Sequence, residues 1–245
     1  MLFSIVTPSF NSEKTIARTI ESVLSQTYHD YEYIIIDGAS TDRTLEIIES
    51  YRPRFNGKLT VISEPDNGIY DAMNKGIHLA QGQLIGIINS DDFLEDECLE
   101  YVSKKYNPNS PYQIIYGIVR IINSDYEELA LRFIHHRYLL YHGMINHSAT
   151  FVSKALHEKY GAYDTQYKSA ADYDFMLKMS KKSDVEFVPD YHLFSNFMLG
   201  GISGTYRGIL ENNEVEFRNG LISKKEFYLR KIKIMVKKLL FGTKA

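Results

Sequence analysis

The chain of 245 residues is 44% hydrophobic and 24% charged, which is typical of a folded globular protein with one large α/β domain or two closely packed halves. Its net charge of −3 argues against a general nucleic-acid binder, because such proteins are usually basic. The single cysteine, Cys98, excludes an internal disulfide framework and a cysteine-rich zinc site, and it favours a reducing compartment. No signal peptide or membrane-spanning run is visible, so we expect a cytoplasmic protein.

Strand and helix patterns alternate through the first hundred residues. Ser12 is the expected N-cap of the first helix, whose apolar residues between positions 16 and 24 fall on one face. Repeated alternation of this kind predicts a mostly parallel sheet covered by helices on both faces. We expect strands over residues 3–7, 33–36, 58–63 and 84–88, and further helices over residues 42–51 and 70–80.

The clearest break in the chain is the Asn-Pro-Asn-Ser-Pro stretch at residues 107–111. Beyond it lies a mixed region rather than a continued strand–helix alternation. We therefore divide the chain into residues 1–106, residues 107–222 of the same domain, and a helical tail at residues 223–245. In the mixed region we expect strands over residues 113–122, 127–133 and 184–189, and helices near residues 154–160 and 170–182.

Carboxylates follow three of the four strands expected in the first half. Asp37 comes after the second strand, Glu64 and Asp66 after the third, and Asp91 and Asp92 after the fourth. Ligands of open α/β sheets bind at the carboxyl ends of the strands, so these side chains are the first candidates for a site. Their charge suits a divalent cation better than bare phosphates. Neither a G-x-G-x-x-G fingerprint nor a Walker P-loop is present, so a Rossmann dinucleotide site is not supported.

Asp91 and Asp92 follow the apolar run Leu-Ile-Gly-Ile-Ile and are expected at a buried strand end. Two adjacent carboxylates would repel each other there and raise one pKa unless a cation neutralised them. Mg²⁺ or Mn²⁺ would meet this requirement, because these ions bind through one or two carboxylates together with substrate phosphates. The alternative is that both acids cap a helix that starts near Glu95.

Seven short segments, in this order along the chain, resemble glycosyltransferase family 2. Its enzymes have the GT-A fold, a Rossmann-like and mostly parallel sheet flanked by helices, to which this chain adds a mixed acceptor-side region and a helical tail. The segment at residues 70–76 and the asparagine-led motif at residue 89 are similar to transferases that build bacterial O-antigen or capsular polysaccharide. The matching segments are residues 4–11, 35–42, 64–68, 74–76, 89–92, 147–151 and 171–174.

The resemblance implies an inverting, metal-dependent transferase that moves a sugar from a nucleoside diphosphate, with uridine favoured, to a hydroxyl of a glycan or lipid-linked glycan. Residues 1–106 would bind the nucleotide sugar and residues 107–222 the acceptor. Asp92 would hold Mn²⁺ or Mg²⁺, whereas Asn89 replaces the acid with which many members begin this motif. Donor contacts are implied for Thr7, Pro8, Phe10, Asp37, Ser40, Glu64, Gly68, Asn74 and Asp91.

Transfer by a single displacement needs a general base for the acceptor hydroxyl, and the resemblance assigns that role to Asp172. Asp174 follows two residues later on the same expected helix and would point about 200° away, so only one of the two acids should face the site. The alternative is that both acids simply complement the helix dipole from its first turn.

Two further features carry implications of the same kind. The resemblance suggests that His147 contacts the acceptor or its phosphate, with a structural histidine as the alternative. The glycine-rich segment at residues 200–204 resembles a loop that closes over the donor in this family. Glycine permits the backbone movement that such a loop requires, although a plain surface turn is the alternative.

The tail is basic although the whole chain is acidic, because residues 220–245 contain eight Lys or Arg and one acid. Its apolar residues recur at helical spacing with lysines between them, as in amphipathic helices that lie on anionic membranes. We therefore expect a peripheral protein on the cytoplasmic face of the membrane, with a helix packed on the domain or on a second subunit as the alternative. The apolar residues are Tyr228, Ile232, Met235, Leu239 and Leu240.

Two other functions stay open on the sequence. A sugar-nucleotide pyrophosphorylase has a related architecture, but it needs a glycine- and arginine-rich loop after the first strand, where this chain has Pro-Ser-Phe-Asn at residues 8–11. A non-catalytic module for sugars or nucleotides is disfavoured because Asp172 is retained beside an intact set of donor residues. Slow hydrolysis of the donor would distinguish a transferase from such a module.

Overall fold

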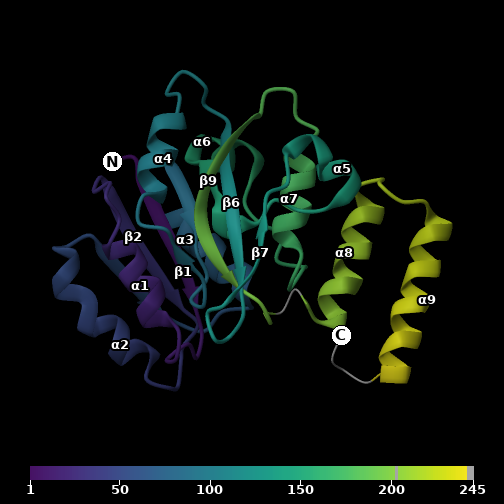
Figure 1. Ribbon diagram of the computed structural model, residues 1–245, viewed down its shortest axis with the longest axis horizontal. Coiled ribbons are helices and arrows are strands. Elements are labelled where there is room, and N and C mark those ends of the chain that lie inside the picture. The colour runs from purple at the N-terminus through teal and green to yellow at the C-terminus, as the bar shows by residue number, and fades with distance from the viewer. Residues whose placement is uncertain (202–203, 242–245) are drawn as a thin grey trace.

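The computed structural model describes residues 1–201 and 204–241. One mixed sheet runs through the protein (Figure 1). Its strands are β1 (Phe3–Ser9), β2 (Tyr31–Asp37), β3 (Leu59–Ser63), β4 (Leu84–Ile87), β5 (Phe93–Leu94), β6 (Gln113–Ile122), β7 (Glu128–Arg132), β8 (Thr150–Ser153) and β9 (Glu186–Met198). Their spatial order is β3-β2-β1-β4-β8-β6-β9-β5, and β7 pairs with β6.

The first four strands confirm the parallel arrangement predicted from the sequence. β1 pairs in parallel with β2 and β4, and β2 pairs in parallel with β3. The register sets Ser9 of β1 beside Asp37 of β2, and Asp37 beside Ser63 of β3. The carboxyl ends of these strands therefore form one edge of the sheet, where the predicted site residues come together.

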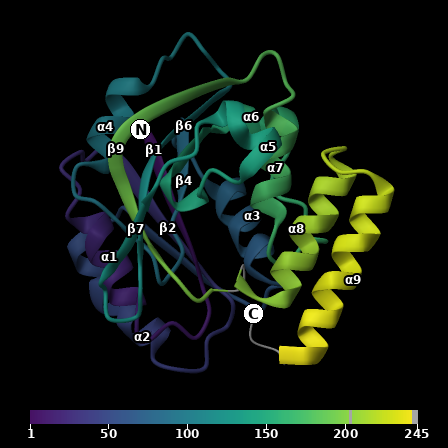
Figure 2. The same cartoon turned by 45° about the vertical axis from the view of Figure 1, so that its right-hand side comes forward.

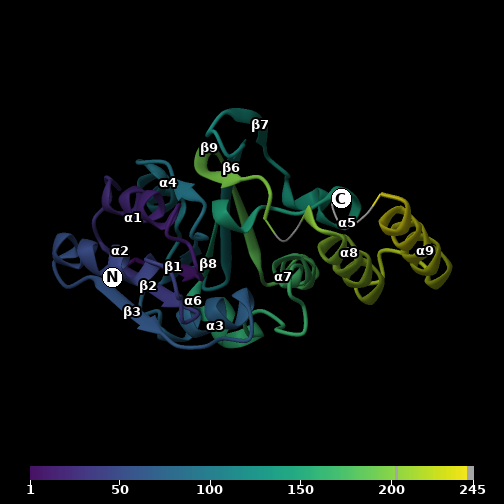
Figure 3. The same cartoon turned by 90° about the horizontal axis from the view of Figure 1, so that it is seen from below.

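Helices cover both faces of the sheet, as the sequence predicts (Figure 3). The helices are α1 (Ile16–Leu24), α2 (Thr44–Tyr51), α3 (Ile69–Leu79), α4 (Cys98–Lys105), α5 (Leu139–His142), α6 (Lys154–Tyr160), α7 (Ala171–Met179), α8 (Tyr206–Arg218) and α9 (Lys224–Phe241). Ile20 of α1 and Ile48 of α2 belong to the core on one face, which α4 also covers. Met73 of α3 and Leu156 of α6 belong to the core on the other face, together with α7.

Several local expectations differ from the structure. Ser12 does not cap α1, which begins after Thr15, because the Ser12 hydroxyl hydrogen-bonds with Ser90 Oγ at 2.7 Å. The strand expected over residues 184–189 continues to Met198, since it pairs with β6 along its length with two register shifts. The sequence analysis did not anticipate β8, β5 or α8, whose short or polar segments lack a clear periodic pattern.

Strand direction changes between the two halves of the sheet. β8 runs antiparallel to both β4 and β6, whereas β6 and β9 are parallel. Because of this reversal, the carboxyl end of β4 and the amino end of β8 lie at the same edge. The acids that follow β4 and the histidine that precedes β8 therefore approach each other.

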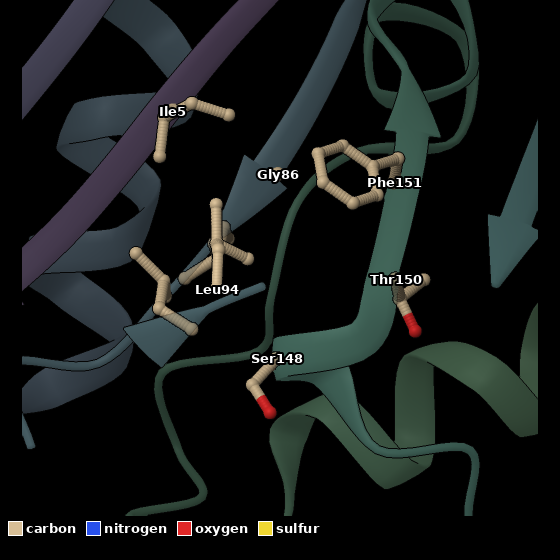
Figure 4. A pocket seen from close by; sticks show the side chains of 8 residues that line it. Ile5, Gly86, Leu94, Ser148, Thr150 and Phe151 are labelled. Carbon is tan, nitrogen blue, oxygen red and sulfur yellow. The ribbon is translucent and has the colours of Figure 1, made fainter. Parts of the chain in front are cut away.

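Tightly packed apolar side chains support this edge from within the sheet. Ile5, Leu94 and Phe151 surround Gly86, where an added Cβ would lie 2.5 Å from the Phe151 ring (Figure 4). The gap between these side chains has no room for a water molecule. Close packing of this kind resists local rearrangement, so the strand ends rest on a rigid base.

The last three helices form a layer at one end of the molecule, with α8 between α7 and α9 (Figures 1 and 2). The predicted tail helix is present as α9, which packs against α8. Within residues 1–201 and 204–241, none of the helices combines the length and the apolar character needed to cross a bilayer.

Candidate active site at the carboxyl edge of the sheet

Asp37 lies at the centre of a hydrogen-bond network that crosses the strand ends. Its buried carboxylate accepts hydrogen bonds from the hydroxyls of Ser9, Ser40 and Ser63 at 3.2, 2.5 and 2.8 Å. The Ser40 N–H also donates to it, at 2.9 Å. Four protein donors therefore fix this carboxylate, and the network shapes the turn after β2.

Phe10 offers an open aromatic surface beside this turn, since its side chain is 61% exposed. Gly38 brings the main chain against it: an added Cβ would lie 3.4 Å from the Phe10 ring and 2.5 Å from Asp66 Oδ2. Thr7 and Pro8, by contrast, are buried within β1. Of the residues predicted to border the nucleobase, Phe10 is thus the one with free surface, and Asp66 lies close to it.

The remaining donor candidates have partners within the protein. Glu64 forms an ion pair with Lys75 at 2.8 Å. The Asn74 amide donates to the Tyr163 carbonyl at 2.8 Å and accepts the Tyr163 N–H at 2.9 Å, so it links α3 to the segment before α7. Gly68 precedes α3 with a φ of +114°, a conformation that favours glycine. Their contacts with a donor stay a prediction.

Asp92 is buried after β4 and is only partly satisfied. Its Oδ1 accepts the N–H of Met198 at 2.8 Å, while its Oδ2 has no hydrogen-bond partner among the described residues. Burial, and after it the charge of Asp91, raises the pKa of Asp92 to about 8. Burial also raises the pKa of Asp91. β5 separates both acids from α4, which begins at Cys98, so the alternative that they cap this helix is wrong.

Asp172, in the first turn of α7, is held by donors from three parts of the chain. The Tyr70 hydroxyl donates to its Oδ1 at 2.7 Å, and the Tyr173 N–H donates to the same oxygen at 3.0 Å. The Nδ1 of His147 lies 3.1 Å from its Oδ2. These contacts fix the direction of the carboxylate and join α7 to α3, which lies on the same face of the sheet.

His147 links Asp172 to the acids that follow β4. Burial lowers the pKa of His147, but the hydrogen bond to Asp172 and the negative charges of Asp172, Asp92 and Asp91 outweigh this effect and raise the pKa above its ordinary value. The His147 Nε2 is buried and has no hydrogen-bond partner in the described part of the chain. The imidazole is thus positioned between the two groups of carboxylates.

Asp174 points away from this cluster. Its Oδ1 accepts from Asn219 Nδ2 at 2.8 Å, and its Oδ2 lies 2.6 Å from Lys178 Nζ. Both acids belong to the first turn of α7, so both complement the helix dipole. Only Asp172, however, also faces Tyr70 and His147, as the two-residue spacing predicts.

The residues after β4 fit a divalent cation. Asp92 Oδ2 and Asn89 Oδ1 are buried oxygens without a hydrogen-bond partner among the described residues, and oxygen ligands are those that Mg²⁺ prefers. No three His, Cys, Asp or Glu side chains within residues 1–201 and 204–241 form a complete metal site. A cation here would therefore need further oxygens from a bound diphosphate or from water, as is usual for Mg²⁺.

Two residues at this edge of the sheet had no role in the sequence analysis. Tyr70 belongs to the segment at residues 70–76, but nothing in the sequence indicated its contact with Asp172, which lies 102 residues further along the chain. Lys168 Nζ donates to the Asn67 carbonyl and lies beside Gly68, so it brings a positive charge next to one of the predicted donor contacts. The predicted glycine-rich loop includes residues 202 and 203, which lie outside the described residues.

Known proteins resemble this chain in sequence. The family described as glycosyl transferase family 2 matches residues 4–167. A PGL/p-HBAD biosynthesis glycosyltransferase of Mycobacterium bovis (strain BCG / Pasteur 1173P2) is 33% identical over 178 residues, which are 72% of this chain and 69% of that protein. Chondroitin synthase of Pasteurella multocida (strain Pm70) is 33% identical over 184 residues, 74% of this chain but 19% of that protein.

Solved structures share the arrangement of the sheet and helices. Residues 1–349 of S. aureus TarS, in complex with UDP-GlcNAc, match with a TM-score of 0.68 at 17% identity, over 99% of this chain and 74% of that chain. Mannosyltransferase PcManGT from Pyrobaculum calidifontis, in complex with GDP-Man and Mn2+, matches with a TM-score of 0.64 at 14% identity, over 98% and 76% of the two chains. The fold is the GT-A fold predicted from the sequence, and the chain belongs to glycosyl transferase family 2.

Proposed function

We propose that the protein transfers a sugar from a uridine diphosphate sugar to a hydroxyl of a glycan or lipid-linked glycan, with inversion at the anomeric carbon. The observation that carries the proposal is the buried Asp172 carboxylate, which Tyr70 and His147 hold close to the acids after β4. Membership of family 2 supports glycosyl transfer, and the UDP-GlcNAc complex of TarS supports a uridine nucleotide.

Asp172 is the proposed general base. In a single displacement, the acceptor hydroxyl loses its proton while it attacks the anomeric carbon from the face opposite the departing diphosphate. Tyr70 and Tyr173 both donate to Oδ1, which leaves Oδ2, beside His147, to take the proton. A carboxylate fixed in this way needs no reorientation when the acceptor arrives.

Asp92 is proposed to hold Mn²⁺ or Mg²⁺. The bound cation would act as a Lewis acid that neutralises charge on the departing diphosphate. The unpartnered Oδ2 and raised pKa of Asp92 support this role, because an adjacent cation would stabilise the ionised form of a carboxyl that the protein itself leaves poorly satisfied. The Mn2+ in the PcManGT complex supports it further.

The nucleotide is proposed to lie along the ends of β1, β2 and β3. Its base would stack on the exposed ring of Phe10, next to the turn that Asp37 and Ser40 shape. The other proposed donor contacts come from Thr7, Pro8, Glu64, Gly68, Asn74 and Asp91.

The acceptor is proposed to bind on the side of His147 and to be an intermediate of bacterial surface polysaccharide synthesis at the cytoplasmic face of the membrane. A relative named for chondroitin synthesis supports a glycan acceptor. The basic helix α9 supports peripheral attachment to a membrane, because its sequence combines lysines with large apolar residues.

A donor screen followed by product analysis tests this function. We expect a UDP-sugar to raise the melting temperature more with Mn²⁺ than without it, and we expect the same donor to be hydrolysed slowly in the absence of an acceptor. With a glycan acceptor, NMR of the anomeric proton should show the configuration opposite to that of the donor. Retained configuration, or nucleotide binding with neither hydrolysis nor transfer, would contradict the proposal.

A further inference from the structure

One face of α9 packs against α8. The Asn213 amide of α8 donates to the main-chain carbonyl of Phe227 at 3.1 Å, and the Phe217 and Phe227 rings stack with centroids 4.7 Å apart. Arg230 forms an ion pair with Glu216 of α8 at 2.6 Å. These contacts clamp α9 along α8, so α9 is not a free tail.

The opposite face of α9 carries a row of large apolar side chains that the protein does not cover. Their exposed fractions lie between 47% for Val236 and 86% for Leu239. At about 100° per residue, the six positions fall within an arc of about 120° whose centre lies opposite Phe227 and Arg230. Figure 2 shows α9 as the outermost helix of the layer. The row consists of Tyr228, Leu229, Ile232, Met235, Val236 and Leu239.

Lysines border this apolar row on both sides. Lys224, Lys231 and Lys238 follow one edge of it, and Lys233 and Lys237 follow the other. Within residues 1–201 and 204–241, none of these five forms an ion pair with an acid of the protein. Their charges are therefore available to an anionic partner.

We propose that this face of α9 docks on an anionic lipid bilayer, with the apolar row in the interface and the lysines on the headgroup phosphates. A cationic helix with a wide apolar face binds such surfaces through both effects at once. A second copy of the chain fits the face less well, since two such helices would bring their lysine rows together. The lysines that border the apolar row therefore favour an anionic lipid over a second copy of the chain.

The contacts between α9 and α8 also determine how the docked protein is oriented on the membrane. α8 joins α9 to α7, because Asn219 at the end of α8 donates to Asp174 of α7. A bilayer that holds α9 therefore also sets the orientation of α7 and of Asp172 relative to the membrane plane. This inference rests on the peripheral attachment put forward under Proposed function and names the surface that makes it. Because that surface lies outside the proposed catalytic site, a failure of docking would leave the proposed transfer reaction intact.

Vesicle sedimentation with the full chain tests the proposal. We expect binding to vesicles of phosphatidylcholine with phosphatidylglycerol, little binding to phosphatidylcholine alone, and weaker binding as salt rises. Ile232→Glu together with Met235→Glu should weaken binding at least about tenfold, because it removes buried apolar contact and adds repulsion. Lys231→Gln should weaken it about fivefold, the effect of one basic residue at the surface.

The matched control is Leu131→Glu on β7, because Leu131 and Ile232 are both 58% exposed. This variant should bind vesicles as the wild type does. Unchanged binding by the α9 variant, or equal loss in the β7 control, would overturn the proposal. A dimer in light scattering that the α9 variant disrupts, without vesicle binding by the wild type, would overturn it in favour of a second copy. Donor hydrolysis in solution should be the same in all variants, which separates this test from that of catalysis.

Discussion

Two buried carboxylates at the same edge of the sheet, one after β2 and one after β4, differ in how many hydrogen-bond donors the protein gives them. Asp37 and Asp92 are 0% and 1% exposed. Asp37 accepts hydrogen bonds from three serine hydroxyls and a main-chain N–H. Asp92 has one main-chain donor, and its Oδ2 is without a partner in the described part of the chain. The protein itself therefore satisfies Asp37, whose contact with a donor stays a prediction, whereas Asp92 is suited to a ligand that the chain does not supply.

This difference shows why burial alone does not identify an acid that lacks a partner within the protein. Several hydrogen-bond donors stabilise the ionised form of a buried carboxyl, so such a group needs no bound ligand. A buried carboxyl with a raised pKa and an unpartnered oxygen costs free energy in the empty protein. Sites where that cost persists tend to be sites of binding or catalysis.

The largest expected effect concerns a third buried carboxyl, Asp172. Asp172→Asn keeps the shape of the side chain but removes the base, so kcat should fall about 10³-fold while nucleotide and Mn²⁺ binding persist. Single-turnover assays and calorimetry measure the two quantities. Asp174→Asn is the matched control, since Asp174 faces Lys178 and Asn219, and it should affect stability more than turnover. Near-wild-type turnover of Asp172→Asn would refute the base assignment.

Two matched substitutions test whether Asp37 and Asp92 differ in their contribution to stability. Asp37→Asn disturbs a satisfied network and should lower the free energy of unfolding by about 2–4 kcal/mol. Asp92→Asn replaces a poorly satisfied acid and should change it by less than about 1 kcal/mol. Urea unfolding at pH 7 without metal measures both. Mn²⁺ with UDP should stabilise the wild type but not Asp92→Asn, and equal destabilisation by the two substitutions would contradict the distinction.

The pH dependence of metal binding sharpens the same comparison. Because the pKa of Asp92 is raised to about 8, the metal-free protein holds a proton there at pH 7, and a cation must displace it. Mn²⁺ affinity in the presence of UDP should rise about tenfold per pH unit between pH 6 and pH 8 and then level off. The free energy of unfolding of the metal-free protein should fall as the pH rises from the ordinary aspartate pKa to about 8. Over this range the folded state binds one proton more than the unfolded state, at Asp92. Calorimetric titrations that show a flat affinity would argue against Asp92 as the ligand.

The smallest expected effect concerns a residue that positions the base. Glu211 of α8 accepts the N–H groups of Lys168 and Ser169 at 2.8 and 2.7 Å, just before α7. Glu211→Gln should weaken these bonds, cost about 1 kcal/mol of stability and lower kcat several-fold with KM for the donor unchanged. Glu214→Gln is the control, because Glu214 pairs only with Arg218 on the same helix among the described residues. Equal effects of the two substitutions would remove Glu211 from this role.

Much of the first half of the fold could be predicted because the spacing of apolar residues in each segment there indicates a strand or a helix. Apolar runs such as residues 84–88 are short, uniform and followed by polar turns, so both their type and their order are readable. β9 was only partly predicted, since its central residues include Pro189 and Asp190 and its pairing shifts against β6. A strand whose position depends on a distant partner leaves a weaker trace in its own sequence.

The same limit applies to the site. The helical spacing of Asp172 and Asp174 predicted that only one of them would face the cluster, and the structure confirms that geometry. The contacts of Tyr70 with Asp172 and of Asn74 with Tyr163 join residues about ninety to one hundred positions apart. No local period encodes such contacts, so they became visible only in the folded chain. The catalytic and metal roles themselves stay predictions.

The reversal of strand direction between β4 and β8 has a mechanical consequence. Main-chain hydrogen bonds pair Ile85 with Val152, so one sheet joins the part of the chain that carries Asp92 to the part that follows His147. A hinge motion that separates the two parts would break those hydrogen bonds. Substrates must therefore enter and leave through shifts of surface connections alone, and the radius of gyration in solution should be the same with and without nucleotide.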